Sequence, residues 1–294
     1  MLKKMMLVAT GLSLSFAVHT ANYFFYNDGR PEDTKRTHNF IKAAEKANDK
    51  TLDYLFPHVE LPNIDLPQST PDYGLAVPAN MTYNREEFQK FKGTYLEQTA
   101  DAGADYLKGI VFCGDSLTNA MGCYGPYLKN YQVVAAGNLG VYDFLEFNGE
   151  CYNHSEEKKT PLQWFAELKP SVLYIMLGTN GVSLMSLDYH IKKYNDMLDG
   201  IRTVLPDAKI VLVAIPGYAA HRDTVDFNGK KVDSFNMMLL ETAKKRGMYF
   251  LNFGDATRDN KGNIRPELCT EDGVHWTNAC MALYVNYVRT HALP

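Results

Sequence analysis

The chain has 294 residues, of which 46% are hydrophobic and 22% charged, a balance typical of a globular protein and unlike a disordered, collagenous or coiled-coil chain. Thirty basic and 34 acidic residues give a net charge of −4, which provides no basic field for nucleic acid. Five cysteines are too few for a disulfide scaffold, and no Cys-x-x-Cys or His-Glu-x-x-His spacing indicates a zinc site. We therefore expect no metal, no cofactor and no nucleic-acid partner.

Residues 1–27 have the pattern of a targeting segment. Lys3 and Lys4 precede an apolar run from residue 5 to residue 18, which predicts a secretory signal peptide. Apolar residues resume at 21–26, so an uncleaved signal anchor remains an alternative, and a buried N-terminal helix is a third. The first two predict an extracellular protein, secreted or anchored, that meets the membrane only through this segment.

Residues 28–107 form a helical and proline-rich N-terminal extension. The apolar spacing over 38–56 predicts an amphipathic helix. Five prolines between positions 57 and 78 then exclude a regular helix and predict an extended stretch. A second helical pattern covers 85–107.

From residue 108 to residue 294, short apolar runs alternate with helical patterns. The runs are rich in β-branched residues and apolar on both faces, as expected for parallel strands covered by helices. This pattern predicts a three-layer α/β/α, doubly wound domain with a five-stranded parallel sheet. The predicted strands are 110–113, 132–136, 172–177, 210–215 and 249–252, and the predicted helices are 160–168, 187–204, 232–246 and 278–290.

Ser116 follows the first predicted strand in the sequence Gly114-Asp-Ser-Leu117. A serine at this point lies at the carboxyl edge of the sheet, where ligands bind in such folds, and its N–H can face an oxyanion. A plain helix N-cap is the alternative, since serine is a common one.

Two further motifs follow later strands. Gly178-Thr-Asn180 follows the third strand and can bring an amide beside Ser116; a cap of the next helix is an equal alternative for Asn180. Asp272 and His275 are three residues apart in a loop before the last helix, so the carboxylate can hold one ring nitrogen while the other faces the serine.

Gly140, in the loop after the second strand, can supply another backbone N–H. Together these residues provide a nucleophile, a base with its orienting carboxylate, and donors for an oxyanion, which are the groups that acyl transfer needs.

These motifs resemble those of the SGNH hydrolases, also called the GDSL lipase/esterase family, over residues 108–294. The resemblance implies a flavodoxin-like SGNH fold, with Ser116 as nucleophile, His275 as base, Asp272 as its orienter, and Ser116, Gly140 and Asn180 as the oxyanion hole. The chain is similar to secreted or anchored GDSL-like proteins of Gram-positive bacteria.

The sequence departs from the family pattern at three places. In the second block, residues 138–143 read Asn-Leu-Gly-Val-Tyr-Asp, with Asp143 where a glycine is usual. Gly181 stands where an acidic residue commonly follows the asparagine, and Ala120 where a glycine is frequent. None of these changes removes a catalytic group.

Other residues have more ordinary interpretations. Cys113 is predicted to lie in the core, and a disulfide between Cys123 and Cys151 is an alternative to free thiols. Four aromatic residues are expected either to line a pocket or simply to pack: Tyr142, Phe144, Tyr152 and Trp276. Three histidines are expected on the surface: His154, His190 and His221.

We therefore expect a serine esterase that removes small acyl groups, most simply acetyl, from a small ester or an acylated extracellular carbohydrate. An O-acetyltransferase on the same scaffold is an alternative, because a sugar hydroxyl can replace water. A silent wall- or carbohydrate-binding protein is a third, but it would have no chemical need for all of Ser116, Asn180, Asp272 and His275.

Overall fold

The computed structural model describes residues 75–123, 127–222, 229–259 and 261–294. The predicted signal or anchor segment (1–27), the predicted helix over 38–56 and most of the proline-rich stretch lie outside the described residues. Within the described part of the chain, no helix is both long and apolar enough to cross a membrane.

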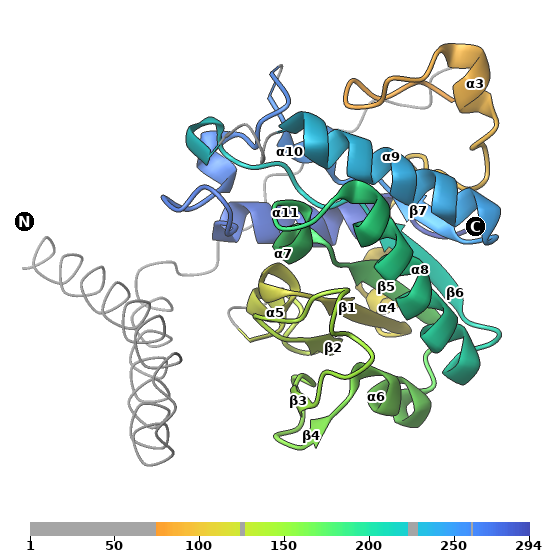
Figure 1. Cartoon of the computed structure of the whole chain (residues 1–294), viewed down its shortest axis with the longest axis vertical. Coiled ribbons are helices and arrows are strands. Elements are labelled where there is room, and N and C mark those ends of the chain that lie inside the picture. Colours follow the sequence, from red (N-terminus) through yellow and green to blue (C-terminus); the bar gives the residue numbers. More distant parts are fainter. Residues whose placement is uncertain (1–74, 124–126, 223–228, 260) are drawn as a thin grey trace, which may run out of the picture. The chain divides into compact units, whose positions relative to one another are not determined.

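Five parallel strands form the central sheet, in the order β2-β1-β5-β6-β7 (Figure 1). Each predicted strand is present, with its ends within two residues of the prediction. The strands are β1 (Ile110–Gly114), β2 (Gln132–Ala135), β5 (Val172–Met176), β6 (Lys209–Val213) and β7 (Tyr249–Leu251), and a small antiparallel pair is formed by β3 (Gly149–Glu150) and β4 (Lys158–Lys159).

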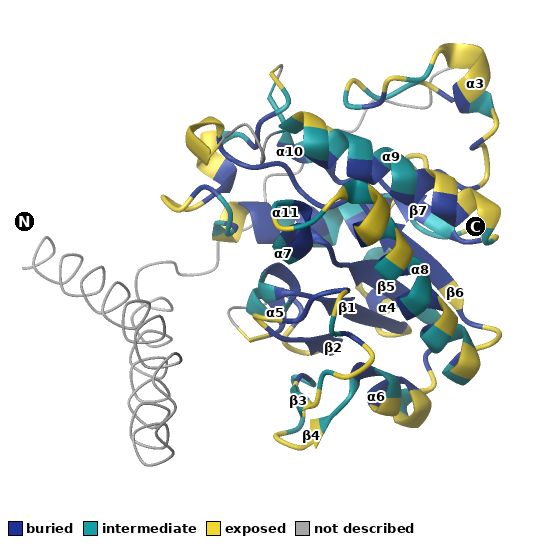
Figure 2. Cartoon of the chain, in the orientation of Figure 1, coloured by how far each residue is buried: buried dark blue, intermediate teal, exposed yellow. Residues whose placement is uncertain are grey.

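Side chains alternate between two hydrophobic clusters along each strand, one on each face of the sheet. In β1, Val111 and Cys113 belong to one cluster, while Ile110 and Phe112 belong to the other. All five β1 residues are buried, and the strands lie inside the buried interior (Figure 2). Cys113 is therefore a core residue, as predicted.

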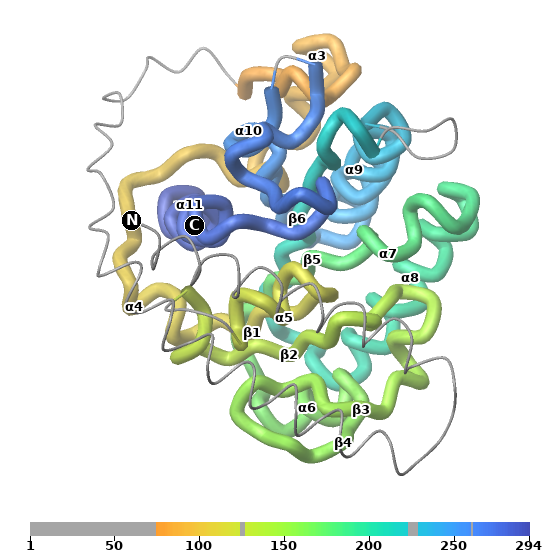
Figure 3. The backbone as a smooth tube through the Cα atoms, turned by 90° about the vertical axis from the view of Figure 1, so that its left-hand side faces the viewer, coloured from red at the N-terminus to blue at the C-terminus, as the bar shows by residue number. Residues whose placement is uncertain are grey.

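Helices cover both faces and complete the three-layer α/β/α fold (Figure 3). The first cluster includes residues of α6 (Pro161–Leu168), α8 (Leu187–Val204) and α9 (Gly229–Lys245), and the second includes residues of α4 (Gly103–Leu107), α5 (Ser116–Cys123) and α11 (Asn278–Thr290). The short elements are α3 (Arg85–Gln89), α7 (Thr179–Val182), α10 (Gly254–Thr257), and the 3-10 turns η1 (Ala220–Arg222) and η2 (Pro266–Leu268).

The single helix expected over 85–107 is wrong. The structure has two short helices there, α3 and α4, and the chain between them pairs with the free edge of β7. The Leu96 N–H donates to the Phe250 carbonyl at 2.9 Å, and the Phe250 N–H donates to the Thr94 carbonyl at 2.8 Å. Tertiary pairing thus overrides a helical pattern, because it gives an otherwise exposed sheet edge its hydrogen-bond partners.

Candidate active site

The loops that carry the predicted site residues meet at one edge of the sheet. Gly114 of β1 is in register with Ala135 of β2 on one side and with Met176 of β5 on the other. The three strands are parallel, so the segments that follow them leave the sheet at the same edge (Figure 1).

Ser116 is the first residue of α5 and is partly exposed. The preceding residue, Asp115, is fully buried, and its Oδ1 accepts the Leu117 N–H at 3.2 Å, which fixes the turn from β1 into α5. Burial raises the pKa of Asp115 to about 6, while the Leu117 N–H and the nearby His275 oppose this rise.

His275 lies between Ser116 and Asp272, although it is 159 residues from the serine in sequence. Its Nε2 is 3.1 Å from Ser116 Oγ, and its Nδ1 is 2.5 Å from Asp272 Oδ2. The structure thus brings the three predicted residues into one hydrogen-bonded chain. Glu271, the neighbouring carboxylate, is exposed, and Asp272 is the carboxylate that contacts His275.

Asp272 is held in its charged form by its own loop. Its Oδ1 accepts the N–H groups of Val274 and His275 at 2.9 and 3.0 Å and the Thr270 hydroxyl at 2.8 Å. Partial burial favours the neutral acid, but the bonds from His275, Val274 and Thr270 hold the pKa of Asp272 well below its usual range. An ionised carboxylate at this place holds the ring and would stabilise an imidazolium if His275 accepted a proton.

Gly273 makes the tight turn between Asp272 and His275. Its φ is +70°, a left-handed conformation that side chains disfavour. A Cβ atom there would also lie 2.7 Å from both Arg222 Cγ and His221 Nε2, so η1 packs directly on this turn. His221 is exposed, as expected from the sequence.

Asn180, in α7, faces the loop that follows β2. Its Nδ2 donates to the Leu139 carbonyl at 3.2 Å and, at 3.5 Å, to the Gly137 carbonyl. One face of the amide is therefore tied to this loop, which keeps the asparagine at the same edge of the sheet as Ser116.

The N–H of Gly140 is already bonded in this structure. It donates to Asp143 Oδ1 at 3.0 Å, within the turn that the departure from the family pattern creates. The Tyr142 ring lies against Gly140 so closely that a Cβ atom there would collide with it. The structure therefore does not leave this N–H open, and an oxyanion would have to replace the Asp143 carboxylate to use it.

Of the three histidines expected on the surface, one is in the core. His190 is fully buried, not on the surface, whereas His154 is exposed. No disulfide joins Cys123 and Cys151; the first is exposed and the second is buried. Of the four aromatic residues, Phe144 and Trp276 are buried in the core, Tyr152 is partly buried, and only Tyr142 is exposed.

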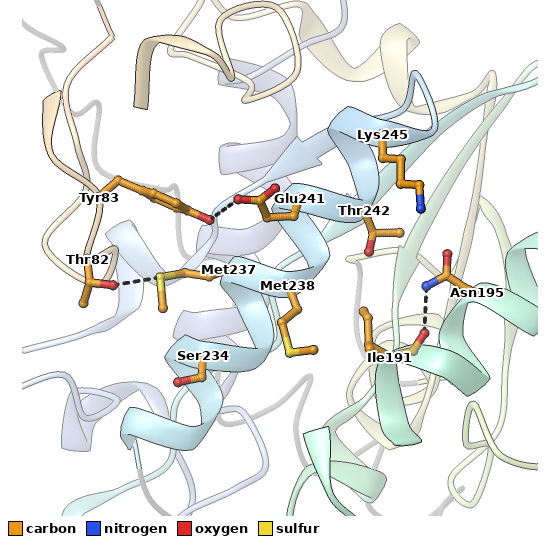
Figure 4. A pocket seen from close by; sticks show the side chains of 10 residues that line it. All are labelled: Thr82, Tyr83, Ile191, Asn195, Ser234, Met237, Met238, Glu241, Thr242 and Lys245. Atoms are coloured by element: carbon orange, nitrogen blue, oxygen red, sulfur yellow. Dashed lines mark hydrogen bonds between the residues drawn. The ribbon is translucent and has the colours of Figure 1, made fainter. Parts of the chain in front are cut away.

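A cavity of about 620 Å³ lies apart from these residues, between α8, α9 and the segment before α3 (Figure 4). Tyr83 donates to Glu241 across it, and Thr82 contacts the Met237 sulfur. None of the predicted site residues lines it. We therefore assign the chemistry to the sheet edge and not to this cavity.

Comparison with known proteins gives one family match. Residues 112–283, more than half of the chain, match the GDSL-like Lipase/Acylhydrolase family. Among curated proteins, none matches.

Solved structures with similar chains include a GDSL-like lipase from Bacteroides thetaiotaomicron (20% identity, TM-score 0.48, covering 64% of this chain and 88% of that one). An acetylxylan esterase from Geobacillus stearothermophilus is 16% identical, with a TM-score of 0.45 and coverage of 63% and 94%. A carbohydrate esterase of family 3 from Talaromyces cellulolyticus is 15% identical, with a TM-score of 0.42 and coverage of 61% and 93%.

Proposed function

Since the chain belongs to the GDSL-like lipase/acylhydrolase family and is a hydrolase of ester bonds, we propose that it cleaves short acyl esters, acetyl above all, through an acyl-enzyme on Ser116. The observation that carries this proposal is the continuous chain from Ser116 Oγ through His275 to Asp272, with distances of 3.1 and 2.5 Å.

In the proposed mechanism, Ser116 Oγ attacks the ester carbonyl while His275 Nε2 accepts its proton. His275 then gives this proton to the leaving alkoxide, and the acyl group remains on the serine. Water, activated by the same nitrogen, hydrolyses the acyl-enzyme and restores Ser116. Asp272 keeps the Nδ1 proton in place throughout.

The Ser116 N–H and the Asn180 amide donate hydrogen bonds to the oxyanion in this proposal. The Gly140 N–H is a third donor once it is released from the Asp143 carboxylate. Asn180 Nδ2 donates to the Leu139 carbonyl at 3.2 Å and, more weakly, to the Gly137 carbonyl at 3.5 Å, so an oxyanion would take over the hydrogen of the longer bond. Donors held in place before the reaction are worth most where charge develops in the transition state.

The rings that pack against the glycines of these loops favour a short acyl group. The Phe235 ring lies under Gly178, the His190 ring lies under Gly181, and both rings are fully buried. On the other side, the Tyr142 ring covers Gly140. We infer from these contacts that little room is left for a long acyl chain beside Gly178, Gly181 and Gly140.

The decisive experiment is a series of p-nitrophenyl esters from acetate to decanoate with the full chain. We expect the highest kcat/KM with acetate and no turnover by Ser116→Ala. Equal rates from both proteins would overturn the esterase proposal, and a maximum at eight or ten carbons would overturn the preference for acetyl.

The acceptor is tested in the same assay. Adding an oligosaccharide and analysing products by mass spectrometry distinguishes free acetate, which we expect, from an acetylated sugar, which would mean an O-acetyltransferase. We further propose that the protein acts outside the cytoplasm on a small or carbohydrate ester, as the sequence of residues 1–27 suggests. Recovery of the full chain only from the cytosol of its host would contradict this location.

A further inference from the structure

The short helix that presents Asn180 rests on two stacked rings. α7 has only four residues and packs against both α8 and α9 (Figure 3). His190 comes from the first of these helices and Phe235 from the second. Their ring centroids are 4.3 Å apart, the ring planes differ by 13°, and both residues are fully buried.

Each ring closes on one of the two glycines that flank Asn180. A Cβ atom on Gly178 would lie 2.7 Å from Phe235 Cε1, and one on Gly181 would lie 2.8 Å from His190 Nε2. Gly178 also has a φ of +129°, which side chains disfavour. The α7 backbone therefore packs directly on the two rings, at Gly178 and at Gly181. No room is left for a side chain between backbone and ring at either position.

His190 contributes its ring, and not its nitrogens, to this contact. Among the described residues, neither ring nitrogen of His190 has a hydrogen-bond partner, although the residue is fully buried. An unpaired buried polar group costs about 1–3 kcal/mol, and an apolar ring would avoid this cost. Burial, and to a smaller extent Lys231, lowers the pKa of His190 to about 4, so the ring is neutral at neutral pH.

We propose that His190, stacked on Phe235, is a positioning residue that fixes α7 and thereby aims the Asn180 amide at the oxyanion. This inference rests on the proposed function. The Leu139 carbonyl holds the amide from one side at 3.2 Å, and the His190 ring supports the backbone of α7 at the residue after Asn180.

The role predicts a defined kinetic signature. An oxyanion donor acts mainly in the transition state, so a misplaced Asn180 lowers kcat and leaves KM nearly unchanged. Removing one such donor outright lowers kcat by about 10²–10³-fold. We expect the loss of the His190 ring, which displaces the donor without removing it, to lower kcat by about 10–100-fold.

Three variants separate positioning from stability. His190→Ala removes the support, whereas His190→Phe keeps a ring on Phe235. The Phe variant should retain kcat within about threefold, since the nitrogens bond to none of the residues that the structure describes. Leu198→Ala, two turns further along α8, opens a comparable buried cavity away from α7. We expect it to destabilise the fold with kcat retained.

A double-mutant cycle with Gly181 tests the same contact. Gly181→Ala brings a methyl group against the His190 ring and should lower kcat. In the His190→Ala background the ring is absent, so the same methyl group has room. Residues in contact give non-additive effects, so the double variant should recover part of the kcat that Gly181→Ala loses.

The readouts are kcat and KM on p-nitrophenyl acetate and the side-chain amide signal of Asn180 in a ¹⁵N NMR spectrum, assigned by its loss in Asn180→Asp. A shifted amide signal and a lower kcat in His190→Ala, but not in Leu198→Ala, support the proposal. An unmoved signal with unchanged kcat overturns it. If the wild type shows no Ser116-dependent turnover, the proposed function fails, and the amide signal still decides the role of His190.

Discussion

Asp272 is surrounded by donors that make its charge permanent at neutral pH. Asp272→Asn keeps the shape of the side chain but favours the wrong tautomer of His275 and no longer stabilises the imidazolium. We expect kcat/KM to fall by about 10–10³-fold, because the same change costs about 10⁴-fold in a serine protease and other acceptors can partly replace the carboxylate. Glu271→Gln, at the exposed neighbour, is the matched control; an equal loss there would refute the assignment.

Asp143 controls whether Gly140 can act. Its carboxylate accepts the Gly140 N–H at 3.0 Å and places a negative charge beside this proposed oxyanion donor. Asp143→Ala should free this donor and remove the repulsion, so we expect kcat to rise about three- to tenfold. The control is Glu146→Ala in the same turn. A lower or unchanged kcat in Asp143→Ala would show that Gly140 is not an oxyanion donor.

Asp115 carries a charge that the fold tolerates at a cost. Its folded pKa of about 6 lies above its ordinary value of 3.8, so the folded state binds the proton more tightly, and stability is lost as pH rises from 3.8 to 6. Asp115→Asn keeps the acceptor for the Leu117 N–H without the charge. We expect it to raise the free energy of unfolding at pH 7.5 by about 2 kcal/mol, with the difference gone at pH 4. A variant less stable at pH 7.5 would contradict this.

Some secondary-structure elements follow from the local sequence pattern, and others depend on tertiary contacts with distant residues. The five strands are predictable because each is apolar on both faces, a pattern that only a covered parallel sheet satisfies. The segment 94–96 is not, because its pairing with Phe250 depends on an edge strand more than 150 residues away. Local sequence carries no signal for that partner.

The site shows the same division. Ser116, Asn180 and His275 are predictable because each follows a strand or precedes a helix in a short motif that places a reactive group at the sheet edge. The bond between Gly140 and Asp143 depends on side-chain direction in a turn, which spacing does not reveal. His190 could have been recognised as buried, since it begins the buried stripe of α8 that continues through Tyr194, Met197, Leu198 and Ile201.

The edge segment also gives a prediction at the level of the sheet. Leu96→Pro removes the N–H that donates to the Phe250 carbonyl, so we expect a loss of about 3 kcal/mol in the free energy of unfolding, measured by urea denaturation. Glu97→Pro is the control, because the Glu97 N–H makes no backbone bond among the described residues. Equal stability of the two variants would mean that the segment contributes little to the fold.

For the molecule as a whole, two histidines contribute to the response to acid. His190 and His291 both have pKa values lowered by burial from 6.5 to about 4. His291 stacks on Tyr287 with ring centroids 3.7 Å apart, as His190 stacks on Phe235. Below pH 6.5, each histidine takes up a proton in the unfolded chain but stays neutral in the folded one, so each favours unfolding.

Lowering the pH from 7 to 5 should therefore destabilise the protein, even though Asp115 works in the opposite direction. Each histidine removes about 2 kcal/mol over this range and Asp115 returns about 1 kcal/mol, which leaves a net loss of about 3 kcal/mol from these three groups. Urea denaturation at half-unit pH steps measures this slope. The His190→Phe/His291→Phe variant keeps both stacks without the titrating nitrogens, so its stability should stay level or rise slightly as the pH falls to 5. A wild-type protein equally stable at both pH values would show that neither histidine is kept neutral by the fold.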